Sequence, residues 1–154
     1  MIFVTADSCR VQLERLSRLL VSAFPGSTIY RHTDLLRVSH EVSSHRVDAV
    51  FLEAVKEKTN SFDFIRMLRR KNPELPVFII AKTEGFCDEA EAAGANGCFV
   101  LPDGEQQLLK AMRLISLYNV YKVCVSTILI QICTILLFKV EKYGKLYYNI
   151  KKMS

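Results

Sequence analysis

The chain has 154 residues, of which half are hydrophobic and 24% are charged, with only 6 glycines and 4 prolines. This composition excludes a disordered or collagen-like chain, and the length allows one domain with an appendage. The net charge is +5, but the last 16 residues hold five lysines and one glutamate and account for +4 of it. The body is therefore nearly neutral, and we expect no direct binding of nucleic acid.

Five segments rich in β-branched and aromatic residues punctuate the first hundred positions, and three of them are continuously apolar. Such runs are typical of strands that are buried on both faces of a parallel sheet. The predicted strands are Ile2–Ala6, Ser27–Tyr30, Asp48–Leu52, Val77–Ala81 and Gly97–Val100.

Between these segments, apolar residues recur with helical spacing and predict five helices, of which the fourth, Glu89–Ala93, is short. Ser8, Thr33 and Ser61 are candidate N-caps. A basic cluster, Arg66 with Arg69–Lys71, is predicted to point outward from the end of the third helix, as a solvated face. Alternating strands and helices predict an α/β fold, a doubly wound parallel sheet with helices on both faces. The helical apolar positions are Leu13, Leu16, Leu20, Phe24, Leu35, Val38, Val42, Phe64, Ile65, Leu68, Leu108, Leu109 and Met112.

The cysteines show neither a disulfide framework nor a zinc signature, because they are odd in number, widely spaced and without a CxxC pair. We therefore expect a reducing, cytoplasmic compartment, and the N-terminus has no signal-peptide pattern. The five are Cys9, Cys87, Cys98, Cys124 and Cys133.

Enzymatic motifs are missing from the sequence. No Walker sequence, GxGxxG, Cys–His or Ser–His–Asp arrangement can be read, so no catalytic residue is predicted. His32, His40 and His45 lie in or near the predicted second helix, with Glu41 beside them. Because His40 and His45 are five residues apart, they do not suit a shared metal ion.

Three segments resemble the receiver domain of bacterial two-component response regulators over about residues 1–115. They are VDAVFLE (47–53), SFDFIRMLRRKNPELPVFIIA (61–81) and EAAGANGCFVLP (91–102), in the order and spacing of that family. The resemblance implies a flavodoxin-like five-stranded sheet of order 2-1-3-4-5. It also implies a signalling module that takes a phosphoryl group from a histidine kinase onto an Asp, beside a divalent cation.

Four positions depart from the family pattern that the resemblance implies. The phosphoacceptor-equivalent position is Glu53, the acidic pair is Ala6-Asp7, and the two switch positions are Ala81 and Leu101. Glutamate places its carboxylate one methylene farther out, and in-line phosphoryl transfer depends on positioning. Asp7 and Glu53 together predict at most a weak Mg²⁺ site.

These departures favour a degenerate receiver that acts by protein–protein interaction with a histidine kinase, another receiver or an output protein. Glu53 is either a permanent mimic of the phosphorylated state or a solvated residue in a relic pocket. One alternative is a working phosphoacceptor with relaxed chemistry. Another is the truncated front of a longer DNA-binding response regulator, although no helix-turn-helix pattern follows Met112.

Residues 116–154 form a hydrophobic and then basic tail without an assigned domain. Its centre, Val123–Phe138, has 16 residues without a charge, and as a helix it measures roughly 24 Å, short of a ~30 Å hydrocarbon core. Three interpretations of 114–138 stay open: association with a membrane, a helix packed on a partner, and out-of-frame or truncated coding sequence.

Overall fold

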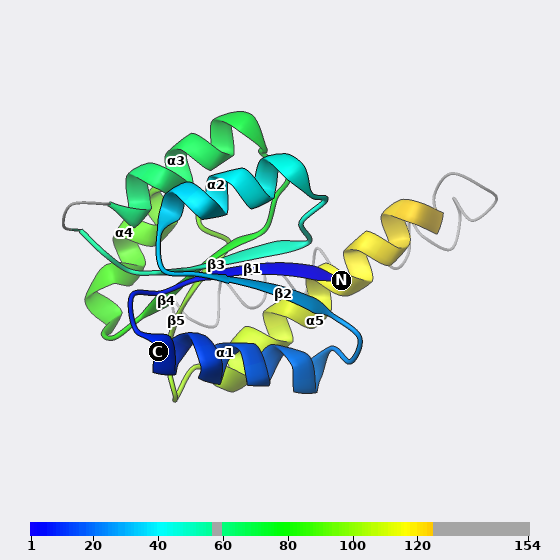
Figure 1. The fold of residues 1–154 in the computed structure, drawn as a ribbon, viewed down its shortest axis with the longest axis horizontal. Coiled ribbons are helices and arrows are strands. Elements are labelled where there is room, and N and C mark those ends of the chain that lie inside the picture. Colours follow the sequence, from blue (N-terminus) through cyan, green and yellow to red (C-terminus); the bar gives the residue numbers. More distant parts are fainter. Residues whose placement is uncertain (57–59, 125–154) are drawn as a thin grey trace, which may run out of the picture. The chain divides into compact units, whose positions relative to one another are not determined.

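The computed structural model describes residues 1–56 and 60–124, with side chains to residue 117 (Figure 1). Within them, five parallel strands form one sheet in the order β2-β1-β3-β4-β5, which confirms the predicted fold class. The strands are β1 (Ile2–Ala6), β2 (Thr28–His32), β3 (Ala49–Glu53), β4 (Val77–Ala81) and β5 (Gly97–Val100). The helices are α1 (Arg10–Ala23), α2 (Leu35–Ser44), α3 (Ser61–Lys71), α4 (Cys87–Ala92) and α5 (Glu105–Cys124), with a 3₁₀ turn, η1 (Glu84–Phe86), before α4.

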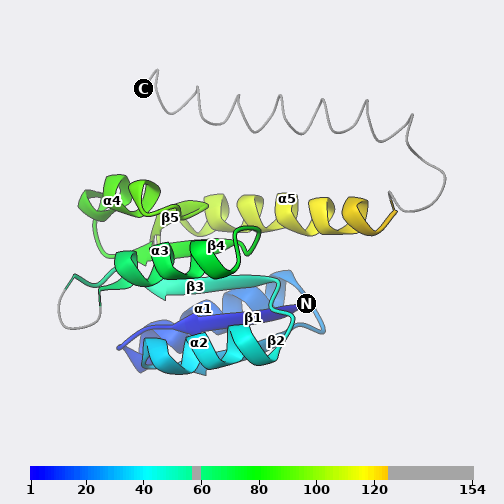
Figure 2. The same ribbon diagram turned by 90° about the horizontal axis from the view of Figure 1, so that it is seen from above.

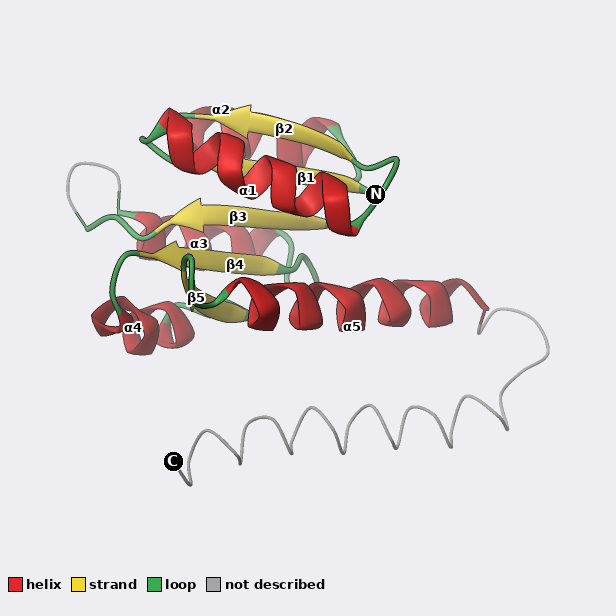
Figure 3. Cartoon of the chain, turned by 90° about the horizontal axis from the view of Figure 1, so that it is seen from below, coloured by secondary structure: helices red, strands yellow, loops and turns green. Residues whose placement is uncertain are grey.

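Helices cover both faces of the sheet: α2, α3 and α4 lie on one side, and α1 and the start of α5 lie on the other (Figures 1 and 2). Every residue of β3 and β4 is buried, which explains why their sequences are continuously apolar until the last residue of β3. The arrowheads of β2, β3 and β4 point to the same edge in Figure 3. Side chains that follow these strands are therefore brought together at one edge.

All three predicted N-caps are wrong by one residue. Asp34 caps α2 by accepting from Arg37 N, and Asn60 caps α3 by accepting from Phe62 N. The α1 N-cap is Cys9, without a side-chain bond. Ser8 and Ser61 instead use their hydroxyl groups to contact Glu53, as described below. At α2 and α3 a carboxylate or amide next to the predicted cap takes the capping position, and the Ser8 hydroxyl donates to the Glu53 carboxylate instead of capping α1.

Arg69 was predicted to point outward, and this is wrong. Its guanidinium donates to the carbonyl oxygens of Gly94 (2.6 Å from Nε), Pro73 (3.3 Å) and Leu75, and to Oδ1 of Asn96. Asn96 Oδ1 also accepts from Val77 N at 2.8 Å. We call these contacts the arginine clamp, since they tie the end of α3 to the segments that enter β4 and β5.

Cys87 and Cys98 form a disulfide that the cysteine spacing did not indicate. Cys87 begins α4 and Cys98 is the second residue of β5, and the two elements pack against each other. The pairing depends on the packing of α4 on β5, so spacing along the chain gave no sign of it.

The chain divides into a compact unit, Met1–Met112, and a second unit that begins at Arg113, inside α5. The hydrophobic tail Val123–Phe138 lies outside the described residues except for its first two positions, so its three interpretations stay predictions. Among the residues that are described, no helix has the length and apolar character needed to span a membrane.

Candidate functional site

The carboxyl edge of the sheet gathers the four positions that the sequence singled out. Glu53 ends β3, Asp7 follows β1, Ala81 ends β4 and Leu101 follows β5. Since β3 lies between β1 and β4, the residues after those two strands flank Glu53. Asp7 and Glu53 are each only 9% exposed, and they interact electrostatically across the β1–β3 pair.

Both oxygens of the Glu53 carboxylate have protein partners. Oε2 accepts from the backbone nitrogen of Ser8 at 2.9 Å and from its hydroxyl at 2.7 Å. Oε1 lies 3.2 Å from Nζ of Lys82, the residue after β4, whose side chain is 76% exposed. Each strand neighbouring β3 thus supplies one partner, and we call the three residues the Ser8–Glu53–Lys82 network.

A second serine holds the backbone of Glu53 and the loop that follows it. The Ser61 hydroxyl donates to the carbonyl oxygen of Glu53 at 2.6 Å and accepts from Val55 N at 3.3 Å. Ser61 N donates to the Val55 carbonyl at 2.9 Å, and the Ser61 side chain is buried. The start of α3 therefore fixes the end of β3, which positions the carboxylate.

The pKa values of the two carboxyl groups of the site shift in opposite directions. Burial raises the pKa of Asp7, and the nearby Glu53 charge raises it further, against a hydrogen bond from Cys9 N to Asp7 Oδ1 at 2.7 Å. Burial also acts to raise the pKa of Glu53, but the hydrogen bonds from Ser8 and the contact with Lys82 outweigh it, and the net pKa is lowered. The hydrogen bond and the charge contact of Lys82 with Glu53 raise the pKa of Lys82. The favoured state therefore has Glu53 ionised and paired with a cation that the chain supplies.

The residues at this edge do not suit a divalent cation. A Mg²⁺ site needs oxygen ligands that are free to coordinate, and carboxylates supply most of its protein ligands. Both Glu53 oxygens are engaged, one oxygen of Asp7 accepts a hydrogen bond from Cys9 N, and Ala6 brings no carboxylate. The Lys82 ammonium also lies against Glu53, so a cation would have to displace it. The weak Mg²⁺ site therefore finds no support in this geometry.

Two partners of Glu53 were missed at the level of sequence. Ser8 was interpreted as a helix cap, and Lys82 was assigned no role. The strand order holds the signal that finds them, because any polar residue directly after β1 or β4 flanks the end of β3. Ala81 is buried and Leu101 is partly exposed, and neither offers a polar side chain to the carboxylate.

The loop after β3 contacts the segment that leads into α4. Lys56 Nζ lies 2.5 Å from Glu89 Oε2 in α4 and 5.6 Å from the centre of the Phe86 ring. The Phe86 ring stacks on Phe62 of α3, with 6.3 Å between ring centroids. Lys56 therefore links the loop beside Glu53 to α4 and to η1, and the aromatic pair links η1 to α3.

Two other polar clusters lie outside this site. Glu41 pairs with His32 and with His45, each at 3.3 Å from one carboxylate oxygen, so His32 and not His40 joins this cluster. No group of three metal-ligating side chains in a suitable arrangement occurs among the described residues.

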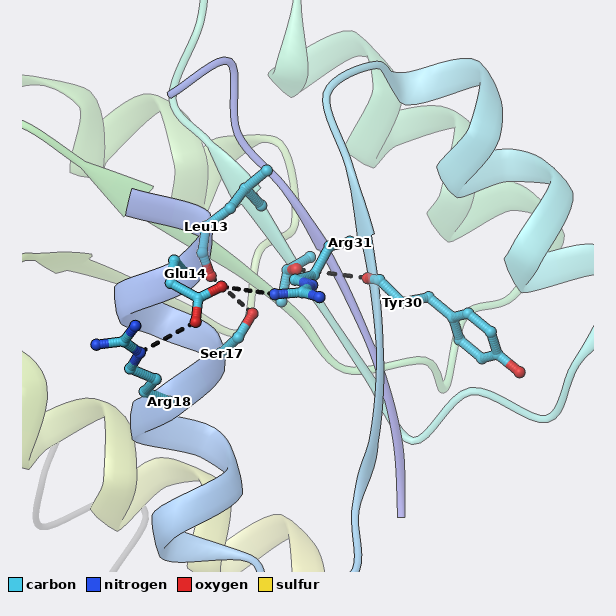
Figure 4. A network of polar contacts seen from close by, with 7 residues as sticks. Leu13, Glu14, Ser17, Arg18, Tyr30 and Arg31 are labelled. Carbon is cyan, nitrogen blue, oxygen red and sulfur yellow. Dashed lines mark hydrogen bonds and ion pairs between the residues drawn. The ribbon is translucent and has the colours of Figure 1, made fainter. Parts of the chain in front are cut away.

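The second cluster lines a groove of about 440 Å³ between α1 and β2. There Glu14 contacts Arg31 at 2.6 Å and Arg18 at 3.0 Å, as Figure 4 shows. These are exposed ion pairs, which contribute little to stability. The groove lies along α1, while the candidate site lies at the carboxyl ends of the strands.

Comparison with known proteins supports a fold and no closer relationship. No protein-family model matches the chain, and no curated protein matches its sequence. Solved structures do match. The signal receiver domain of a DNA-binding response regulator from Colwellia psychrerythraea 34H has a TM-score of 0.67 at 16% identity, covering 75% of this chain and 98% of that one.

Two further structures have the same fold. The receiver domain of an HD domain-containing protein from Pseudomonas fluorescens has a TM-score of 0.67 at 22% identity, with coverage of 76% and 94%. A chemotaxis response regulator of Vibrio cholerae has a TM-score of 0.62 at 19% identity, with coverage of 74% and 97%. The chain therefore has the flavodoxin-like fold of response regulator receiver domains.

Proposed function

We propose that this chain is a receiver-like signalling module whose pocket no longer accepts a phosphoryl group and which acts by protein–protein interaction. The fold is that of receiver domains, which generally serve as signalling modules rather than enzymes. One observation carries the proposal: the Glu53 carboxylate is already bound by Ser8 and by Lys82.

Three features of the pocket oppose phosphoryl transfer. An acceptor oxygen must be free to attack in line, but each Glu53 oxygen has a partner. A phosphoryl group carries negative charge, which Asp7 would repel when it is ionised. Leu101 leaves the wall of the pocket without the cation that the family resemblance implies at that position. Transfer would therefore need Glu53 to exchange three favourable contacts for a repulsive neighbour.

The same network favours the mimic interpretation of Glu53 over the relic interpretation. A solvated relic would be exposed and unpaired, whereas Glu53 is 9% exposed and ionised against Lys82. Lys82 begins the segment that leads to α4, so the carboxylate holds one end of that segment without any modification. The partner is a histidine kinase, another receiver or an output protein, and it reads the face that includes α4.

The test combines phosphoryl transfer with binding. The full chain is incubated with Mg²⁺ and a radiolabelled small phosphodonor, and separately with purified autophosphorylated histidine kinases. A receiver domain with an intact acidic pocket serves as the positive control. We expect no acid-labile label on this chain, while binding to a kinase, measured by surface plasmon resonance, is independent of ATP.

Stoichiometric label on the wild-type chain that a Glu53→Gln variant loses would overturn the proposal in favour of a working phosphoacceptor. The Glu53→Gln variant keeps the size of the side chain, so it separates loss of the acceptor from loss of the fold. Circular dichroism of both chains checks that they are equally folded.

A further inference from the structure

The Cys87–Cys98 disulfide joins the first residue of α4 to the second residue of β5, with 5.3 Å between their Cα atoms. That separation lies inside the range of native disulfides, so the bond needs no movement of the backbone. We propose that this disulfide is a reversible redox site, and that its state controls the order of η1 and α4.

The fold does not depend on this bond, so the reduced form keeps the core. Large apolar side chains fill both faces of the sheet: Phe3, Phe51 and Phe78 lie on one face and Leu52 and Ile79 on the other, all at most 1% exposed. Small domains need disulfides when their cores are insufficient, which is not the case here. Cys98 also packs against the core, where a free thiol behaves as a small hydrophobic group.

Reagents can reach the bond, since Cys87 and Cys98 are both partly exposed. An inaccessible disulfide would stay oxidised regardless of the surrounding thiols, because exchange requires attack on one of its sulfur atoms. Disulfides that form in a reducing compartment are usually transient, and they are catalytic or sense the redox state. The bond therefore fits a responsive role better than a permanent one.

The helix that the bond holds is short and buries a single residue. α4 has six residues, of which Ala90 alone is buried, and a helix of this length is not stable by itself in water. α4 also packs against β5 and β4, and its further contacts include the Lys56–Glu89 ion pair and the stacking of Phe86 on Phe62. The ion pair is partly exposed and weak. Loss of the disulfide therefore leaves the start of α4 free to open locally.

The segment between the site and the bond is short. Lys82 contacts Glu53, and Cys87 follows five residues later, after η1. The segment is thus held at one end by an ion pair and at the other by the disulfide. Reduction frees only the second end, so the redox state changes the surface of α4 and leaves the contacts of Glu53 in place.

The chemistry is thiol–disulfide exchange with a low-molecular-weight disulfide as oxidant. One cysteine thiolate attacks that disulfide, forms a mixed disulfide and releases one small thiol. The second cysteine thiolate then attacks the protein sulfur of the mixed disulfide and releases the other small thiol. The two cysteines lose two electrons and two protons in total, and the oxidant gains both as two thiols.

The experiment equilibrates the full chain in glutathione buffers of graded potential. Alkylation with mass mapping identifies which of the five cysteines are paired, and hydrogen exchange measures protection along the chain. We expect Cys87 and Cys98 to change state together within the glutathione range. We also expect exchange in residues 84–92 to rise about tenfold on reduction, while β1 and β3 stay protected.

Two variants complete the design. Cys87→Ser with Cys98→Ser should show the reduced pattern of exchange in every buffer, and Cys9→Ser, which removes the free thiol, should behave as wild type. The proposal is overturned if residues 84–92 exchange equally in both redox states, or if Cys87 and Cys98 remain paired at the most reducing potential. No phosphodonor is used, so failure here is distinct from failure of the proposed function.

Discussion

The arginine clamp allows a test of how much Arg69, which was predicted to point into solvent, contributes to the free energy of unfolding. In Arg69→Met the apolar part of the side chain is retained, while the four hydrogen bonds of the guanidinium are lost. Those to Gly94 O and Leu75 O are partly buried, and those to Pro73 O and Asn96 are exposed. Water replaces the exposed bonds at little cost, so the two partly buried ones decide the magnitude.

Hydrogen bonds of this kind contribute about 1–1.5 kcal/mol each, since the donor is charged but water reaches part of the site. We therefore expect Arg69→Met to lower the free energy of unfolding by about 2–3 kcal/mol. Urea unfolding of the full chain, followed by circular dichroism in one fixed redox buffer, measures the change. The midpoint should fall while the slope stays constant.

Arg70→Met is the matched control, because Arg70 is exposed and makes a single 3.4 Å bond to Arg66 O on the same helix. It should change stability by no more than about 0.5 kcal/mol. Arg69→Lys keeps the charge but cannot reach four acceptors, so it should recover less than half of the loss. Equal midpoints for Arg69→Met and Arg70→Met would refute the clamp.

Two predictions concern the carboxyl edge. Burial raises the pKa of Asp7 in the folded state. The free energy of unfolding therefore falls as the pH rises through the folded-state pKa, because the folded state disfavours the charged form. Below the unfolded-state pKa the group is neutral in both states and has no effect. Asp7→Asn should therefore have a higher free energy of unfolding than wild type at pH 7, and the two proteins should be equally stable at a pH below the unfolded-state pKa of aspartate. Parallel urea titrations measure both values, and a less stable Asp7→Asn at pH 7 would contradict the prediction. Glu53→Asp alone should not give phosphoryl uptake; uptake should also require Ala6→Asp and Leu101→Lys. Full labelling of the single variant would show that the pocket is more intact than we propose.

The fold could be predicted from the sequence because its strands are buried on both faces. Continuous apolar runs placed three strands at their observed bounds or, for β3, one residue early. β2 was displaced further, since it is an edge strand of mixed polarity that carries Arg31 and ends at His32. β5 is the other edge strand, and its bounds were predicted correctly, so the mixed polarity and exposure of β2 explain the difference.

The site could be predicted only in part, because its contacts join residues that are far apart along the chain. Asp7 and Glu53 were found from the ends of their strands. The bond from Ser8 to Glu53 spans 45 positions and arises because β1 is beside β3. The partners of Arg69 are mostly backbone carbonyls, which have no residue type to recognise. Patterns in the sequence identify the functional side chains, while the hydrogen-bond partners of those side chains depend on which strands are neighbours in the sheet.

The Ser8–Glu53 contact also has a consequence for the mechanics of the sheet. The paired residues of β1 and β3 end at Ala6 and Leu52, and the Glu53 carboxylate then binds the backbone nitrogen of Ser8 beyond that point. On the other side, Ala54 N donates to the carbonyl of Ile80 in β4. The carboxylate thus extends the hydrogen-bonded contact between β1 and β3 beyond the last pair of their backbone residues. Any reaction at this carboxylate oxygen would break its hydrogen bonds to Ser8 and so shorten the contact between β1 and β3.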